Sequence, residues 1–214
     1  MSTTDAGTRT ARDRALRSAW RLNILTIGWN AVEAVVALSA GIAAGSISLV
    51  AFGLDSCVEV SAALVLTWRL AQERRAGCRQ PDDRRATRIL ALCFFALAAY
   101  VSVESVLTLL REQEPEASRV GMLLAAASLV AKPVLARAKR RLAPVLGGRA
   151  QEREAEQTQL CALLSAVVLL GLGLNAALGW WWADPVAALF VSGLAATEGL
   201  RTWRATSLED TCCA

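Results

Sequence analysis

Six apolar stretches of the sequence are close to the length of a membrane-spanning helix. They cover residues 22–44, 46–68, 89–110, 120–136, 160–182 and 183–200. A helix needs about 20 mainly apolar residues to cross the hydrocarbon core of a bilayer. Lipid offers the backbone no hydrogen-bond partners, so such spans must be helical. We therefore predict an all-α integral membrane protein with six transmembrane helices. The fourth and sixth spans are the weaker predictions, because the fourth is short and contains Lys132 and the sixth contains Glu198.

The basic residues lie almost entirely on one side of these predicted spans. Segments 1–21, 69–88 and 137–153, together with Arg201 and Arg204, hold 20 of the 23 lysines and arginines. Basic loops stay in the cytoplasm, so both termini are predicted to be cytoplasmic. The net charge of +4 is then a topology signal and not a nucleic-acid footprint. The predicted organisation is a cytoplasmic N-terminal tail (1–18), a six-helix transmembrane domain (19–205) and a short C-terminal tail (206–214), in the cell (inner) membrane.

Two carboxylates interrupt the second apolar stretch, "GSISLVAFGLDSCVEVSAALVLTW". Asp55 and Glu59 are four residues apart, so they share one helix face about one turn from each other. A charge in mid-bilayer costs roughly 2.5–3.5 kcal/mol on insertion scales, and such groups normally face the bundle interior or a watery cavity. Two neighbouring like charges repel. Either one acid is protonated, or a cation lies between them.

Other charges in the predicted spans leave an alternative open. They are Glu33, Glu104, Lys132 and Glu198, and Lys132 could neutralise Asp55 or Glu59 in a purely structural pair. We favour the cation site, because carboxylate oxygens are competent ligands for zinc, manganese and other divalent ions.

A divalent ion usually takes four or more donors, and the fifth stretch offers candidates. Gln157 and Cys161 are four residues apart on one helix face, although packing or capping would also explain them. Glu154 would lie at the cytoplasmic mouth of the site, or serve only as an acid favoured by the helix dipole. Asn30 and Glu33 give the first span a polar face. They could support the ligands, carry protons or form interhelical hydrogen bonds.

Two stretches resemble a known family. "GSISLVAFGLDSCVE" resembles the second helix of the cation diffusion facilitators, the cation efflux superfamily, and "WWADPVAALFVSGL" resembles the start of their sixth helix. The resemblance covers about residues 19–205. It implies that Asp55 and Glu59 are metal ligands. In the family's fifth-helix pattern, Asp-Ala-x-His-x-x-x-Asp, Gln157 stands at the usual histidine and Cys161 at the usual second aspartate. The chain has no histidine, so the ligand set departs from that of the family.

The resemblance also implies a function. We expect a transporter that exports divalent metal ions from the cytoplasm by alternating access, in exchange for protons. Zinc is favoured because of the thiol, while iron, manganese and cobalt stay open. The chain resembles the short branch of the superfamily that lacks the cytoplasmic C-terminal domain, so a homodimer would form through membrane helices. "GIAAG" (41–45) could mediate it or serve packing within one chain. The alternative function is a non-transporting membrane scaffold or regulatory subunit. No resident cofactor and no enzyme activity are expected.

Overall fold

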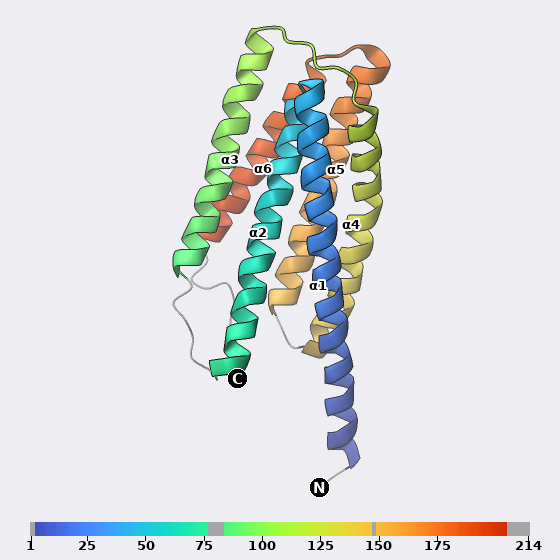
Figure 1. Ribbon diagram of the computed structural model, residues 1–214, viewed down its shortest axis with the longest axis vertical. Coiled ribbons are helices and arrows are strands. Elements are labelled where there is room, and N and C mark those ends of the chain that lie inside the picture. Colours follow the sequence, from blue (N-terminus) through green and yellow to red (C-terminus); the bar gives the residue numbers. More distant parts are fainter. Residues whose placement is uncertain (1–2, 77–83, 147–148, 205–214) are drawn as a thin grey trace.

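The structure is a computed structural model that describes the backbone of residues 3–76, 84–146 and 149–204, and the side chains of residues 17–18, 20–64, 88–141 and 157–204. The described backbone forms six helices and no strand, which confirms the all-α prediction (Figure 1). The helices are α1 (Thr3–Ala44), α2 (Ile47–Ala76), α3 (Arg84–Leu110), α4 (Arg119–Leu146), α5 (Arg149–Leu178) and α6 (Ala183–Arg204).

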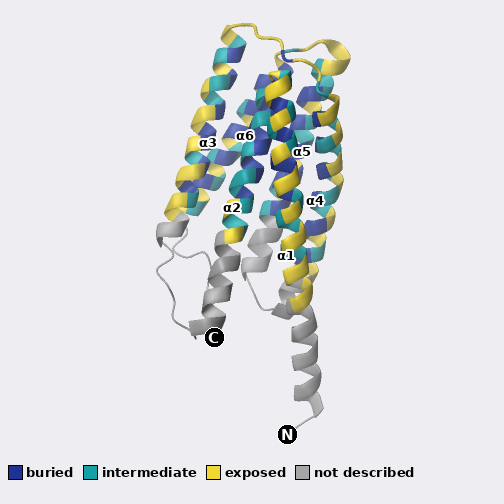
Figure 2. Ribbon diagram, viewed as in Figure 1, coloured by how far each residue is buried: buried dark blue, intermediate teal, exposed yellow. Residues whose placement is uncertain are grey.

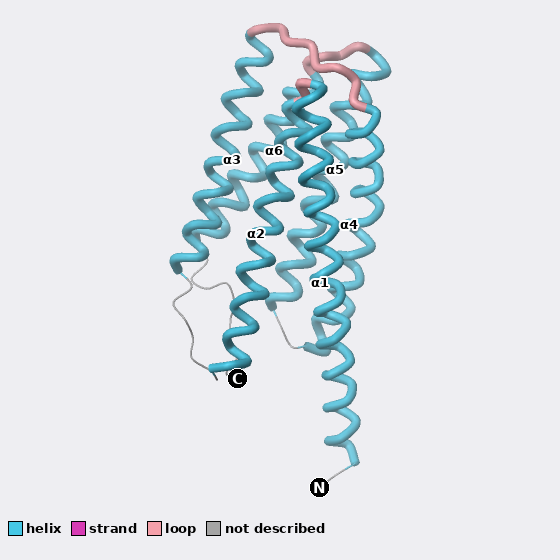
Figure 3. The backbone as a smooth tube through the Cα atoms, viewed as in Figure 1, coloured by secondary structure: helices cyan, strands magenta, loops and turns pink. Residues whose placement is uncertain are grey.

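The six helices lie side by side along one long axis. α1 begins and α6 ends at the same end of the bundle, here named the terminal end, and the three described connections lie at the opposite end (Figure 3). α2 occupies a central place, since it packs against α1, α3, α5 and α6. With six antiparallel helices, the beginning of α1 and the end of α6 lie on the same side of the bundle. That this side is the cytoplasm stays a prediction from the basic residues.

Burial in the bundle follows the pattern of a membrane protein. A core of Leu49, Phe52, Val101, Val168 and Val191 is fully buried between the helices. Large apolar side chains also cover the outer faces, where Val35, Leu123 and Leu170 are each more than 60% exposed (Figure 2). A chain in water rarely exposes so much apolar surface, whereas a lipid-facing bundle must do so. The chain is therefore an integral, multi-pass membrane protein.

The helices differ from the predicted spans mainly at their ends. The fifth helix ends at Leu178 and not at 182, because Gly179 adopts φ 67, the left-handed conformation that ends many helices. Helix α4 qualifies as a candidate membrane span of 23 residues despite Lys132, whereas α6 is not among the five helices long and apolar enough to qualify. The first helix begins at Thr3, so most of the predicted tail 1–18 continues α1, while the tail 206–214 lies outside the described residues.

Helices α1 and α2 form the tight hairpin that their short connection requires. Gly45 turns the chain with φ 64, a conformation open to glycine and costly for other residues. Gly41 then allows close contact, since a Cβ at this position would lie 2.9 Å from the backbone nitrogen of Val50. The first glycine of the "GIAAG" stretch is thus used for packing within one chain, and the homodimer stays a prediction.

A buried carboxylate ties α6 to the beginning of α2. The side chain of Asp184, fully buried in the first turn of α6, accepts hydrogen bonds from Ser46 Oγ (2.7 Å), Ser48 Oγ and the backbone nitrogen of Ile47 (2.9 Å). The first backbone N–H groups of a helix have no partner inside the helix, so the Asp184 carboxylate caps α2 from another element. This cap joins the two stretches on which the family resemblance rests.

Candidate metal centre

Asp55 and Glu59 lie on the inner face of α2 and are nearly excluded from solvent. Asp55 is 5% exposed and Glu59 is 8% exposed. The four-residue spacing sets both side chains on one side of the helix, and the central place of α2 turns that side toward α5 and α6. Both acids therefore point into protein and not into lipid.

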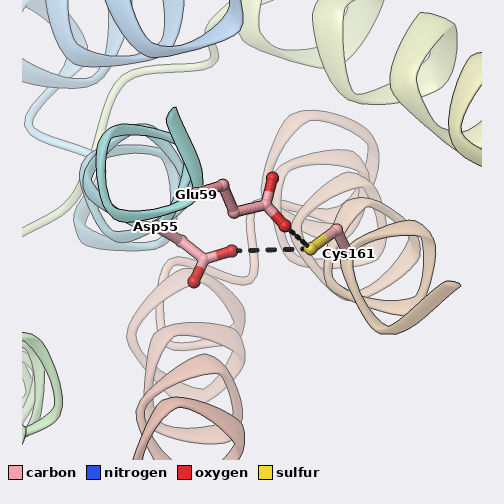
Figure 4. Close-up of side chains that lie close together, drawn as sticks. All are labelled: Asp55, Glu59 and Cys161. Carbon is pink, nitrogen blue, oxygen red and sulfur yellow. Dashed lines mark hydrogen bonds between the residues drawn. The ribbon is translucent and has the colours of Figure 1, made fainter. Parts of the chain in front are cut away.

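The thiol of Cys161, on α5, faces this pair (Figure 4). Cys161 Sγ donates a hydrogen bond to Glu59 Oε1 and a longer one, 3.9 Å, to Asp55 Oδ2. One oxygen of each acid and the sulfur all lie within 4.8 Å of one another, and all three residues are buried. Two carboxylate oxygens and one sulfur thus converge from two helices, as the donors of a metal ion must.

The three side chains line a cavity, and Gln157 belongs to the same wall. The wall consists of Asp55, Glu59, Gln157, Cys161 and Glu198, with the apolar side chains Phe94, Leu160, Leu164, Leu194 and Ala195 around them. Its volume, about 20 Å³, is enough for one water molecule or one ion. Gln157, one helical turn before Cys161, is part of the same wall, so residues of α2 and α5 line one small space together.

The two oxygens of Glu59 have different surroundings. Oε1 faces Cys161, whereas Oε2 accepts a hydrogen bond from Asn30 Nδ2 at 2.7 Å and lies 3.8 Å from Lys132 Nζ. Asn30 and Lys132, from α1 and α4, therefore leave only Oε1 turned toward the cavity. A carboxylate held in this way offers one oxygen to an ion instead of two, which suits low coordination numbers.

Lys132 pairs mainly with Glu33 and only secondarily with the site. Its ammonium lies 2.7 Å from Glu33 Oε2, and neither residue is more than 2% exposed. Ser56 Oγ (2.6 Å) and Ser128 Oγ also donate to the Glu33 carboxylate. Lys132 therefore does lie close enough to Glu59 to neutralise part of its charge, as the alternative interpretation of the sequence proposed. For Lys132, the structure shows ion pairs with Glu33 and Glu59 but none with Asp55.

The structure separates the other candidate residues. Asn30 contacts a site acid directly, whereas Glu33 lies behind Lys132, in interhelical hydrogen bonds, and is not among the residues that line the cavity. The backbone of Glu154 belongs to the first turns of α5, and its side chain lies outside the described part of the chain. Glu198 lines the cavity as well, although the sequence alone identifies it only as a charge within a predicted span. The sequence signal for this residue is an acid within the sixth apolar stretch. Its place beside Asp55 and Glu59 follows only from the packing of α6 against α2.

Six packed helices with buried acids and a thiol facing one small cavity define the class of protein: a multi-pass helical membrane protein with a polar site inside the bundle. The chain belongs to the cation efflux family. The model of the cation efflux transmembrane domain matches residues 86–209, more than half of the sequence. No curated protein matches the chain significantly.

The family match confirms the resemblance found in the sequence and extends along α3 to α6. It includes Gln157 and Cys161 but begins only after α2, so Asp55 and Glu59 lie outside it. Proteins of the cation efflux family transport metal cations and are not enzymes. The chain is therefore a metal cation transporter of the membrane.

Proposed function

We propose that this transporter exports divalent metal ions, zinc in preference, from the cytoplasm across the cell (inner) membrane in exchange for protons. The observation that carries the proposal is the convergence of Asp55, Glu59 and Cys161, whose ligand atoms lie within 4.8 Å of one another. Gln157 supplies the fourth donor from the same cavity wall. No resident cofactor is part of the proposal, because the metal ion is the cargo.

The preference for zinc rests on the kind and number of these donors. A thiolate favours zinc over manganese, which prefers oxygen ligands. Four donors, with Glu59 turned toward the cavity by one oxygen, suit the tetrahedral coordination of zinc better than the higher coordination of hard ions. Iron and cobalt are also compatible with this ligand set, but a thiolate increases their affinity less than that of zinc.

The proposed exchange with protons follows from the same donors. A metal ion binds deprotonated carboxylates and thiolate, so its arrival releases protons and protonation expels it. The ligand oxygens of Asp55 and Glu59 lie within 4.8 Å of each other, and of these two acids Lys132 pairs only with Glu59. In the proposal, the second of these neighbouring negative charges is balanced by either the metal ion or a proton. We propose that this alternation couples zinc export to proton movement in the opposite direction.

Transport by purified protein in proteoliposomes would test the proposal. We expect zinc uptake, followed by a dye inside the vesicles, to accelerate severalfold when the lumen is made acidic, since protons then leave as zinc enters. An ionophore that collapses the pH gradient should remove the acceleration. Uptake that ignores the gradient would contradict the proton coupling. Absence of uptake of any divalent ion would contradict transport and favour the scaffold or regulatory function, in which Lys132 and Asn30 hold Glu59 in place.

Replacement of the thiol tests the choice of metal. We expect Cys161→Ser to lower the affinity for zinc about tenfold or more while changing that for manganese little, because serine removes the soft donor and keeps the size. Isothermal titration with both ions would measure the change. Cys93→Ser, on the exposed surface of α3, is the matched control. An unchanged ratio of the two affinities would show that the sulfur is not a ligand.

A further inference from the structure

Helix α6 supplies a fifth polar group to the cavity, and the proposed ligand set does not use it. Glu198 lines the same cavity as Asp55, Glu59, Gln157 and Cys161. It follows Leu194 by one turn on α6 and lies nearer to the terminal end, where α6 finishes at Arg204. The cavity is therefore lined by a third helix with an acid of its own.

Glu198 is the most exposed of the three acids that line the cavity, and on α6 it is the lining residue nearest to the terminal end. Its side chain is 22% exposed, compared with 8% for Glu59 and 5% for Asp55. An ion that approaches from the terminal end would therefore meet this carboxylate before it reaches the two buried acids. A charged group in an apolar wall raises the local concentration of counter-ions, and thereby the rate at which they enter.

The neighbouring residue Arg201 competes for this carboxylate. Arg201 Nη1 lies 2.8 Å from Glu198 Oε1, one helical turn away, and the arginine side chain is 69% exposed. An ion pair so open to solvent contributes little to stability and is broken easily. A divalent cation could therefore replace the guanidinium at Glu198 without a large penalty.

We infer that Glu198 captures the divalent cation at the terminal-end mouth of the cavity and that Arg201 opposes this capture. The inference rests on the proposed function and adds an access step to it. The ion binds Glu198 as Arg201 turns away to solvent, and then moves inward to Asp55, Glu59 and Cys161. The opposite charges of the pair give the two residues opposite effects on the same step, and an ordinary surface ion pair would not have this property.

Two neutral variants of the full chain in proteoliposomes test the inference, with zinc alone as the probe. We expect Glu198→Gln to raise the half-saturating zinc concentration about three- to tenfold and to leave the maximal rate unchanged, since the buried ligands remain. Arg201→Gln should lower the half-saturating concentration about two- to threefold. Glu104→Gln is the control, because Glu104 lies in α3 and is not among the residues that line the cavity.

The outcomes separate this inference from the proposed function. If the parent protein transports no metal ion, the proposed function is wrong. If it transports zinc and both variants keep the half-saturating zinc concentration of the parent, the capture role is wrong. Shifts of the same sign in both variants, accompanied by a lower melting temperature, would indicate a structural ion pair and overturn the inference. Loss of zinc binding in Glu198→Gln as complete as in Asp55→Asn would make Glu198 a ligand, and would also overturn the capture role.

Discussion

Zinc binding should fall at least about 100-fold in Asp55→Asn and in Glu59→Gln, and zinc transport should cease. Each change keeps the shape of the side chain and removes the negative charge of one of the two buried acids that line the cavity. Loss of residues that merely support a ligand already costs 10–100-fold in metal affinity, so loss of a ligand charge should cost at least as much. Isothermal titration and vesicle uptake would measure both effects.

The two variants should still insert into the membrane and remain folded. Neutral side chains are cheaper to bury than charged ones, and Lys132 keeps its main partner Glu33 in both variants, so the melting temperature in detergent should change little. Glu104→Gln again serves as the control, since it removes an acid from a span without changing the cavity wall. Retention of the parent affinity by either acid variant would show that this acid is not a ligand of the ion.

Removal of Lys132 should destabilise the bundle more than any other neutralising change described here. Lys132→Met leaves the Glu33 carboxylate buried with only hydroxyl partners, since the ammonium at 2.7 Å is gone. Breaking a buried ion pair on one side typically costs about 3–5 kcal/mol. We expect a large drop in the melting temperature in detergent, and we expect the double variant Glu33→Gln/Lys132→Met to recover most of it.

The double variant decides between two explanations of this effect. If the loss arises from an uncompensated charge, neutralising Glu33 restores stability; if it arises from the lost packing of the lysine stem, it does not. Arg111→Met, on the exposed connection after α3, should change the melting temperature little. Equal melting temperatures of the single and double variants would contradict the charge explanation.

The helices could be predicted from the sequence because membrane spans depend on local composition. The ends of the helices are harder to predict from the sequence. The left-handed conformation of Gly179 ends α5 four residues before the apolar run does, and the tryptophans that follow extend the apolar signal without extending the helix. Helix α6 was a weak span by composition and remains one, since its place in the bundle comes from packing against α3 and from the Asp184 cap.

The candidate site could be predicted only where its residues are near in sequence or match a family pattern. The spacing of Asp55 and Glu59 was enough to place them on one face. Gln157 and Cys161 were candidates from their own four-residue spacing and matched the family pattern, and the structure sets them on the same cavity wall. Lys132 could be named from the sequence as a possible partner of Glu59, but its main pairing with Glu33 could not be foreseen, because nothing in a single sequence states which helices are neighbours.

The Asp184 cap restricts how the bundle can change shape. It fastens the first turn of α6 to the first turn of α2, and these two helices carry Asp55, Glu59 and Glu198, whereas α5 carries Gln157 and Cys161. A movement that leaves the cap intact keeps the first turns of α2 and α6 together. If these two helices shift past α5 in this way, the carboxylates separate from the sulfur, and the coordination of a bound ion is lost.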